Sequence, residues 1–470
     1  MPGNVIRFGT SGWRGIIADD FTFHNVRAAS SAIAHFLLSS KPDARAIVGY
    51  DTRFLSEQFA AAAAEVLISH GIRATLCTRP DPTPALSFEI RRGGYDAGVN
   101  FTASHNPALY NGLKFSTANG APALSEVTRE VESLAARVLA GDLPLRGSGE
   151  QKDAESSDPR PPYLNAVRKI VDFDTLRKGK LRVGYDPLFG TGWGYLDTLL
   201  EEGGVSLRPL HNYRDVLFAG QGPDPSEKNL AELGRLVREE KLNLGLATDG
   251  DADRFGMVDA DGSFIQPNFI LALLLDYLIE VRKFPGGAGR SVASTHLVDA
   301  VAAHHGVALY QTPVGFKYVG QLILEDKIAL GGEESAGLSV RGHIPEKDGI
   351  LACLLVAEMV AHRGQSLGEQ IKALYRKVGE YHPVRLNFSL DDSVRSALIA
   401  KLDREHNRFN SQKVRETDRT DGLKMILEDG SWVLFRMSGT EPLCRCYCEA
   451  HSLPDLDRLT AAAKRFIFDD

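Results

Sequence analysis

Short apolar runs alternate with longer helical patterns along most of the chain. The runs at residues 46–51 and 181–186 both end in Val-Gly-Tyr-Asp, and a segment with helical periodicity follows each of them. Apolar runs of this length, bounded by glycine-containing turns, are typical of buried strands. Because strand, helix and strand follow one another, the pattern predicts α/β units whose parallel strands are joined by right-handed crossovers.

Three such units are expected, each in the order strand, helix, strand. The first covers 46–51, 56–70 and 73–77; the second covers 181–186, 195–202 and 205–210; the third covers 291–295, 297–305 and 307–311.

The rhythm changes past about residue 380. A hairpin over 422–427 and 431–436, a strand over 444–449 and a helix over 455–466 predict a small α+β unit. Residues 141–162, which are rich in Pro, Ser and charge, predict an exposed linker between the first two α/β units.

The bulk composition narrows the range of partners. A chain of 470 residues is too long for one core and suggests about three domains. The net charge of −7 argues against a broad surface for nucleic acid or anionic membrane, so an anion must meet a local positive site. No apolar run reaches the length that spans a bilayer and the N-terminus has no apolar signal core, so the cytoplasm is the expected location.

The five cysteines do not suggest a disulfide framework, because their number is odd and no secretion signal precedes them. Cys444, Cys446 and Cys448 alternate along an expected strand. Alternate residues of a strand share one face, so these three thiols are predicted to pack in the core.

Three aspartates alternate in the stretch ATDGDADRFG, at Asp249, Asp251 and Asp253, directly after an apolar run. An EF-hand calcium loop would need glycine and glutamate where Arg254 and Ala260 stand, which excludes that motif. A solvated acidic turn and a divalent metal site remain as interpretations. Adjacent like charges repel one another unless a cation compensates them, which favours the metal site.

Three further loops carry polar chemistry. In TASHNP, Ser104 stands beside His105; the segment is compatible with a plain turn or a phosphoryl carrier, and adjacent side chains rarely face each other. In RMSGTEP, two hydroxyls, a glycine, Arg436 and the nearby Arg445 are compatible with a turn or a phosphate cradle, and the arginines favour the cradle. In GGEESAG, glutamates and a serine suit sugar hydroxyls or a surface loop.

These motifs, with the N-terminal FGTSGWRG, stand in the order FGTSGWRG, TASHNP, DGDADR, GEES and RMSGTEP. In that order, over essentially the whole chain, the sequence resembles the α-D-phosphohexomutase superfamily of phosphoglucomutases and phosphomannomutases. The resemblance implies an α/β fold: three related α/β domains with mixed sheets plus a smaller α+β C-terminal domain, arranged around a central cleft. The expected phosphoserine, metal-binding, sugar-binding and phosphate-binding domains span 1–150, 163–263, 264–376 and 377–470.

The resemblance also implies a role for individual residues. Ser104 would carry the transferable phosphoryl group, flanked by His105 and Asn106. Its phosphate would complete a Mg²⁺ site with the three aspartates Asp249, Asp251 and Asp253. The other implied residues are Arg254 near the reacting phosphate; Gly315, Glu333 and Ser335 for the sugar; Arg436, Ser438, Gly439, Thr440 and Arg445 for the phosphate that does not react; and Arg14 and Lys114 near the phosphoserine.

The proton acceptor is expected to be Lys347 or Lys114. Some bifunctional members of the superfamily have a histidine shortly after the serine of the sugar loop. Here Ser335 is followed by Ala336 and Gly337, so that histidine is absent.

The resemblance implies interconversion of glucose 1-phosphate and glucose 6-phosphate through a phosphoserine enzyme, with a hexose 1,6-bisphosphate as intermediate and activator. The alternatives are a phosphomannomutase or dual-specificity mutase, a glucose 1,6-bisphosphate synthase, and a non-catalytic sugar-phosphate-binding protein. Hexose phosphates are the expected partners, without nucleic acid or membrane, and the chain is expected to be a monomer or homodimer.

Overall fold

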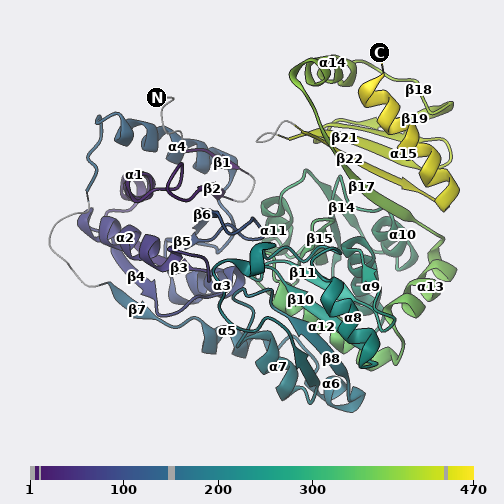
Figure 1. Ribbon diagram of the computed structural model, residues 1–470, viewed down its shortest axis with the longest axis horizontal. Coiled ribbons are helices and arrows are strands. Elements are labelled where there is room, and N and C mark those ends of the chain that lie inside the picture. Colours follow the sequence, from purple (N-terminus) through teal and green to yellow (C-terminus); the bar gives the residue numbers. More distant parts are fainter. Residues whose placement is uncertain (1–5, 10–11, 147–153, 439–442, 470) are drawn as a thin grey trace.

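Four β-sheets organise the chain in the computed structural model, which describes residues 6–9, 12–146, 154–438 and 443–469 (Figure 1). The first sheet has the order β1 (Phe8–Gly9), β2 (Gly12–Ile16), β6 (Tyr110–Thr117), β5 (Ala97–Phe101), β3 (Arg45–Tyr50), β4 (Arg73–Cys77) and β7 (Glu155–Ser157). Its helices are α1 (Phe23–Ser40), α2 (Ser56–Ser69), α3 (Thr83–Gly93) and α4 (Ser125–Leu139).

The second sheet has the order β12 (Phe264–Ile265), β11 (Phe255–Val258), β10 (Leu244–Thr248), β8 (Arg182–Asp186) and β9 (Ser206–Pro209). It is accompanied by α5 (Arg160–Val167), α6 (Phe173–Gly179), α7 (Leu196–Glu202) and α8 (Ala231–Glu239). The third sheet has the order β14 (Leu309–Thr312), β13 (Gly287–Ser291), β15 (Ile328–Glu333) and β16 (Gly337–Val340). Its helices are α9 (Pro267–Glu280), α10 (Leu297–His304), α11 (Phe316–Leu324), α12 (Gly349–Arg363) and α13 (Leu367–Val378).

The fourth sheet is antiparallel throughout and stands apart at the upper right of Figure 1. Its order is β17 (His382–Ser389), β22 (Leu443–Ala450), β21 (Trp432–Met437), β20 (Leu423–Leu427), β19 (Gln412–Asp418) and β18 (Arg408–Phe409), and it carries α14 (Asp392–Leu402) and α15 (Leu453–Phe468). Cys444, Cys446 and Cys448 are buried between this sheet and its helices, which confirms their prediction as core residues.

The first three sheets repeat one topology, which confirms the predicted α/β units. The strand pairs β3 and β4, β8 and β9, and β13 and β14 are all parallel. In each sheet the next central strand is parallel to its neighbour and then turns into an antiparallel partner, as in β5 to β6, β10 to β11 and β15 to β16. The three sheets are therefore mixed, and each has one turn in the same topological place.

Two predicted segments differ from the structure. The strand expected over 291–295 is β13, which ends at Ser291; its sequence, Gly-Ala-Gly-Arg-Ser, lacks the apolar run of a buried strand but pairs on both edges. The segment 141–162 is not all linker, because β7 extends the first sheet beside β4 and α5 begins at Arg160. The domain limits at residues 150, 263 and 376 stay a prediction.

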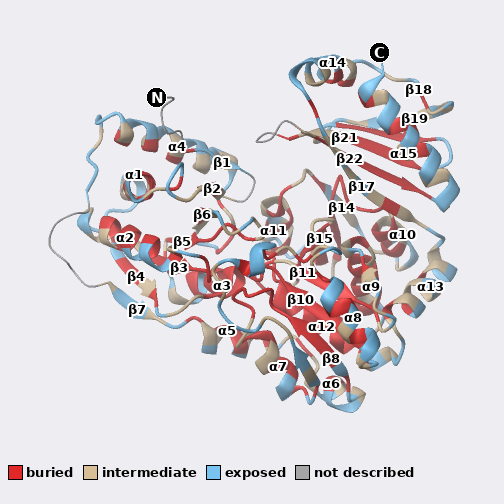
Figure 2. Cartoon of the chain, viewed as in Figure 1, coloured by how far each residue is buried: buried red, intermediate tan, exposed pale blue. Residues whose placement is uncertain are grey.

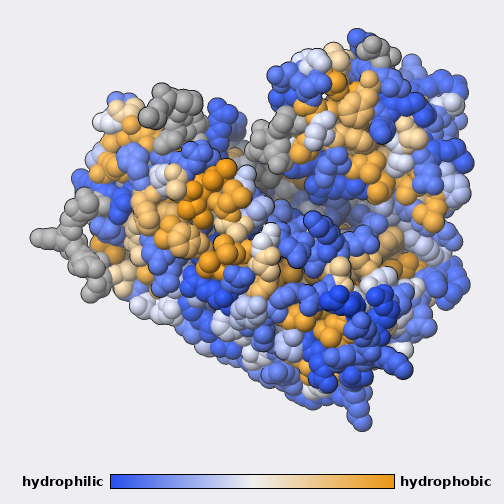
Figure 3. Space-filling view, in the orientation of Figure 1, coloured by the Kyte–Doolittle hydropathy of each residue, from blue (hydrophilic) through white to orange (hydrophobic). Residues whose placement is uncertain are grey.

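The second and third sheets share one hydrophobic core, whereas the first and fourth each have their own. Helix α12 lies in the shared core, and every residue from Gly349 to Val360 is buried (Figure 2). Within the described ranges no single helix is long and apolar enough to cross a membrane; α12 and α13 together meet that test but are bent by 77°. The space-filling surface is notched between the first-sheet lobe and the fourth-sheet lobe (Figure 3).

The fourth sheet meets the third through a buried polar contact. Nζ of Lys424 lies 3.7 Å from the centre of the Trp432 ring, donates to the Val292 carbonyl at 2.8 Å and lies 2.9 Å from Nε2 of His296. The buried Glu449 carboxylate accepts from Trp432 Nε1 at 2.7 Å and from the His296 amide at 3.0 Å. These contacts hold the C-terminal domain at its place beside the other three.

We expect this contact to weaken as the pH falls. Burial and the neighbouring Arg290 lower the pKa of Lys424 from 10.5 to about 7. The folded chain therefore binds this proton more weakly than the unfolded chain. As a result, the free energy of unfolding rises between about pH 7 and about pH 10.5, and this gain is lost as the pH falls to 7. Burial also lowers the pKa of His296 and raises that of Glu449.

Hydrogen exchange of β20 and β22, followed in urea by mass spectrometry, measures the effect. Between pH 7 and 9 the free energy of opening should rise by about 1–3 kcal/mol more in the wild type than in Lys424→Met. Equal pH dependence in the two proteins would contradict the assignment to Lys424.

Candidate functional site

Turns at the ends of the central strands bring the predicted site residues together. Ser104 lies between β5 and β6, the three aspartates lie between β10 and β11, and Glu333 and Ser335 lie where β15 turns into β16. The carboxyl ends of parallel strands are where open α/β sheets present their ligand sites. The structure thus places three predicted motifs at equivalent positions of three sheets.

Ser104 is buried in a strained turn that faces the second sheet. Its φ of 53° lies in the left-handed region, which costs a non-glycine residue about 1–3 kcal/mol. Its Oγ donates to Oδ2 of Asp249 at 2.6 Å, and its amide donates to Oγ1 of Thr102 at 2.9 Å. The expectation that Ser104 and His105 do not face each other is wrong, because the left-handed turn brings Oγ within 3.3 Å of Nδ1 of His105.

Three buried carboxylates form a set that fits a hard divalent cation. Asp249, Asp251 and Asp253 each offer an oxygen within 4.8 Å of the others. Oδ1 of Asp251 and Oδ1 of Asp253 are buried without a hydrogen-bond partner, although Nε of Arg254 lies 4.0 Å from the latter. Carboxylate oxygens are the ligands that Mg²⁺ prefers. Burial, followed by repulsion from the other two acids, raises the pKa of Asp249 well above its usual value.

Two lysines from other parts of the chain compensate these acids. Nζ of Lys114, on β6, lies 2.5 Å from Oδ2 of Asp251 and 2.6 Å from Oδ2 of Asp253. Nζ of Lys347 lies 3.2 Å from Oδ2 of Asp253. Burial lowers the pKa of each lysine, but the adjacent carboxylates outweigh it, and both pKa values are raised. Both predicted base candidates are therefore held as ammonium ions in this arrangement.

Two arginines, Arg14 and Arg254, also carry positive charge near the Ser104 loop. Nη1 of Arg14 donates to Oδ1 of Asn106 at 2.7 Å. Burial and Arg254 lower the pKa of Arg14 to about 10, so it stays charged at neutral pH. Burial, Arg254 and Arg14 together lower the pKa of His105 well below its usual value, which keeps the imidazole neutral. The surroundings of the Ser104 loop favour an added anion.

The predicted sugar residues form a separate part of the site. Oε1 of Glu333 accepts from the Gly315 amide at 2.7 Å, which joins two of the predicted residues. Burial and the neighbouring Glu334 raise the pKa of Glu333 to about 7. Ser335 is half-buried in the next turn.

Among the predicted phosphate residues of the C-terminal domain, the structure describes Arg436 on β21, Ser438 just after that strand and Arg445 on β22. Arg436 and Arg445 are cross-strand partners, and Nε of Arg436 lies 2.9 Å from Oδ1 of Asp421. Oδ2 of Asp421 accepts from the Val314 amide at 3.1 Å, one residue before Gly315. The amide of Ser438, which is buried, donates to the Leu443 carbonyl at 3.0 Å. Gly439 and Thr440 lie outside the described residues.

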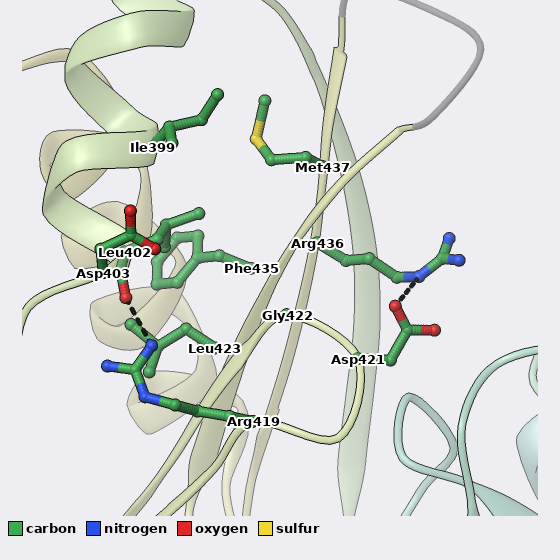
Figure 4. Close-up of a pocket in the computed structure, with 10 residues that line it drawn as sticks. All are labelled: Ile399, Leu402, Asp403, Arg419, Asp421, Gly422, Leu423, Phe435, Arg436 and Met437. Carbon is green, nitrogen blue, oxygen red and sulfur yellow. Dashed lines mark hydrogen bonds and ion pairs between the residues drawn. The ribbon is translucent and has the colours of Figure 1, made fainter.

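A pocket of about 270 Å³ lies beside these arginines, between α14 and strands β20 and β21 (Figure 4). Its walls combine apolar side chains with charged ones, and the guanidinium of Arg436 points toward Asp421. The pocket therefore borders the predicted phosphate site and shares Arg436 with it. It is lined by Ile399, Leu402, Asp403, Arg419, Asp421, Gly422, Leu423, Phe435, Arg436 and Met437.

The sequence interpretation missed Thr83, which belongs to the acidic cluster. Its hydroxyl donates to Oδ2 of Asp251, its amide donates to the Asp251 carbonyl at 2.9 Å, and Asn100 donates to its hydroxyl at 2.9 Å. The flanking Pro82 and Pro84 are the local signal, since they mark a rigid turn after β4. Nothing in that turn indicates which distant residue it contacts.

Four family models match the chain in order. They are described as domains I, II and III and the C-terminal domain of phosphoglucomutase/phosphomannomutase, and they match residues 5–140, 161–262, 266–378 and 394–465.

Individual relatives cover almost the whole chain. A phosphoglucomutase/phosphomannomutase of Thermococcus kodakarensis is 31% identical over 95% of this chain and 94% of its own length. A protein of Methanothermobacter thermautotrophicus described as a phosphoglucosamine mutase is also 31% identical, over 94% and 93%. The crystal structure of a protein from Thermus thermophilus described as a phosphomannomutase superposes with a TM-score of 0.85, at 33% identity over 98% of this chain and 99% of that one.

From the ion pairs of Lys114 we predict that this lysine and a bound metal ion compensate the same carboxylates. In metal-free Lys114→Met, the carboxylates of Asp251 and Asp253 lose a buried partner, so the free energy of unfolding in EDTA should fall by about 3 kcal/mol. Added Mg²⁺ supplies the missing positive charge, so it should stabilise the variant more than the wild type. Urea unfolding with EDTA or Mg²⁺ measures both effects, and Lys228→Met, at an exposed position, is the control. An equal response to Mg²⁺ in Lys114→Met and wild type would contradict this prediction.

Proposed function

Because the chain belongs to the phosphoglucomutase/phosphomannomutase family, we propose that this enzyme interconverts glucose 1-phosphate and glucose 6-phosphate, with Ser104 as the phosphoryl carrier. The observation that carries the proposal is the buried contact of 2.6 Å between Oγ of Ser104 and Asp249. It joins a hydroxyl nucleophile to an acidic cluster that fits Mg²⁺. Phosphoryl transfer depends mainly on positioning and on neutralising charge. This contact would position Oγ of Ser104, and a cation held by the acids would neutralise the charge.

The proposed reaction has two transfers. The phosphoryl group of phosphorylated Ser104 passes to the 6-hydroxyl of glucose 1-phosphate; the bond from phosphorus to Oγ breaks, a bond to O6 forms, and the hydroxyl proton leaves to a base. The resulting glucose 1,6-bisphosphate then reorients in the site, so that its other phosphate faces Ser104. In the second transfer the phosphoryl group on O1 passes to Oγ of Ser104; the bond from phosphorus to O1 breaks, O1 takes the proton that the base holds, and glucose 6-phosphate leaves.

The residues divide this work among them. Asp249, Asp251 and Asp253 would hold Mg²⁺, which when bound supplies positive charge for the phosphoryl oxygens. Arg14 and Arg254 would steady the anionic group on Ser104. Glu333, with Ser335, would bind sugar hydroxyls, and the arginines of the C-terminal domain, with Ser438, would hold the phosphate that does not react.

The substrate is proposed from the sugar loop. The sequence Gly-Glu-Glu-Ser favours glucose phosphate as the substrate. The alternative is a mutase that acts on mannose phosphate or on both sugars. The relatives themselves have names that differ in the sugar. A glucose 1,6-bisphosphate synthase would use the same residues with release of the intermediate. A non-catalytic binding protein is disfavoured, because the serine and all three acids are present.

Ser104 phosphorylation and a substrate panel test the proposal. Intact-mass measurement during turnover should show one added phosphoryl group in the wild type and none in Ser104→Ala, whose activity should fall by several orders of magnitude. Ser104→Thr is the companion variant, since it keeps the hydroxyl. Full activity of Ser104→Ala without phosphorylation would refute the carrier role.

The panel uses glucose, mannose and glucosamine 1-phosphates, each with and without glucose 1,6-bisphosphate or fructose 1,6-bisphosphate. Fastest isomerisation of glucose 1-phosphate is expected. Net formation of glucose 1,6-bisphosphate faster than isomerisation would favour the synthase.

Lys347→Met tests one candidate base. A lysine must lose its proton before it accepts another, and the pKa of Lys347 is raised in this arrangement by Asp253 and Glu346 despite burial. If Lys347 is the base, Lys347→Met and Lys347→Arg should both lose about 100-fold or more in kcat. If the ammonium acts only as a positive charge, Lys347→Arg should recover most of the rate. Normal turnover of Lys347→Met would remove Lys347 as a candidate, and Lys327→Met, at an exposed ion pair, is the control.

A further inference from the structure

A buried arginine, Arg53, binds the backbone carbonyls of the Ser104 loop. Its side chain is fully buried. Nη2 donates to the carbonyls of Ser104 at 2.7 Å and Asn106 at 2.5 Å, and Nη1 donates to the carbonyls of Pro107 at 2.9 Å and Tyr110 at 3.1 Å. One guanidinium therefore binds three carbonyls of the loop between β5 and β6 and that of Tyr110, the first residue of β6.

This arrangement suits arginine and no other side chain. Buried carbonyls need donors, and the guanidinium offers five N–H groups in a rigid planar fork. Its charge is compensated by Asp51, whose Oδ2 lies 3.2 Å from Nε. The loop that it ties contains Ser104 in the left-handed conformation, which persists only where the surroundings hold it.

The repeated Val-Gly-Tyr-Asp motif shows that the arginine is not needed for the turn itself. In the first domain, Oδ1 of Asp51 accepts from the amide of Arg53 at 2.9 Å. In the second domain, Oδ1 of Asp186 accepts from the amide of Leu188 at 2.8 Å. The two turns make the same hydrogen bond, but the second has Leu188 where the first has Arg53. In the second domain the equivalent loop is the aspartate turn and not a serine loop. The arginine accordingly belongs to the Ser104 loop and not to the turn.

The second domain also fixes Arg53. The Phe218 ring lies 4.9 Å from its guanidinium carbon, and Nε of Arg214 donates to the Thr52 carbonyl at 3.1 Å. The Thr52 hydroxyl donates to the Phe189 carbonyl at 2.9 Å. The same domain carries the aspartate turn. Arg53 therefore connects the serine loop of the first domain to the domain that holds the three acids.

We propose that Arg53 is a positioning residue for phosphoryl transfer, which keeps Oγ of Ser104 aligned with Asp249 without touching the substrate. This inference rests on the proposed carrier role of Ser104. A displacement of about 1 Å at a reacting atom costs about 100-fold in rate. Loss of Arg53 is therefore expected to slow the transfer step, while the affinity for hexose phosphate, set by other loops, stays nearly unchanged.

The test compares Arg53→Leu, the residue of the second copy, with Arg53→Lys and wild type. Each protein is phosphorylated with glucose 1,6-bisphosphate, the phosphoserine is counted by intact mass, and the single-turnover rate of transfer to glucose 1-phosphate is expressed per phosphorylated Ser104. Unfolded molecules then do not enter the rate. We expect a loss of about 100-fold for Arg53→Leu and about 10-fold for Arg53→Lys, whose ammonium has fewer donors, with KM changed less than about 3-fold.

Arg282→Leu is the matched control. Its guanidinium also bonds a carboxylate, that of Glu358 on α12, and a backbone carbonyl, that of Ile170 at 2.8 Å, and neither belongs to the serine loop or the acidic turn. Its transfer rate per phosphoserine should stay within about 3-fold of wild type.

Each outcome separates the inference from the proposed function. A transfer rate within about 3-fold of wild type in Arg53→Leu, or in Arg53→Lys if the leucine variant does not fold, would overturn the positioning role. An equal loss in Arg282→Leu would also overturn it, because the effect would then be general. Full activity of Ser104→Ala would instead refute the carrier role on which the inference rests.

Discussion

Three carboxylates that are buried close together repel one another, so positive charge must lie nearby. The arrangement of the rest of the site follows from this constraint. Asp249, Asp251 and Asp253 come from one short turn. The cations that compensate them come from elsewhere: Lys114 from the first sheet and Lys347 from the segment before α12. The acidic turn is therefore electrostatically complete only when three parts of the chain are assembled, so a cation bound there would be linked to domain assembly.

Repetition of one topology explains how the loops meet. The serine, acidic and sugar loops each connect a central strand to an antiparallel partner, so each lies at the same edge of its sheet. Small residues allow close approach where the loops touch. A Cβ on Gly250 would lie 2.6 Å from the Ser104 carbonyl oxygen, and one on Gly349 would lie 2.2 Å from the Arg254 carbonyl oxygen. The glycines thus let backbone from different domains pack against the acidic turn.

The sequence predicted the parts of this molecule whose signals are local. The strands that contain the two copies of Val-Gly-Tyr-Asp are predictable because they are apolar and bounded by turns, and the aspartates because their spacing is unusual. Strand β13 was misplaced because Gly-Ala-Gly-Arg-Ser has no apolar signal. Thr83 was missed because its partner, Asp251, is 168 residues away, and no local pattern encodes a contact of that range.

Adjacent backbone amides link the residues proposed for the sugar to those proposed for the phosphate that does not react. The Val314 amide donates to Asp421, which holds Arg436, and the Gly315 amide donates to Glu333. A glycine is favoured at 315 because its φ is 130°, a conformation that side chains disfavour. Since two neighbouring peptide groups fix one carboxylate from each domain, displacing the C-terminal domain must disturb the sugar-side glutamate as well. The relative placement of these two proposed subsites therefore depends on the backbone at Val314 and Gly315.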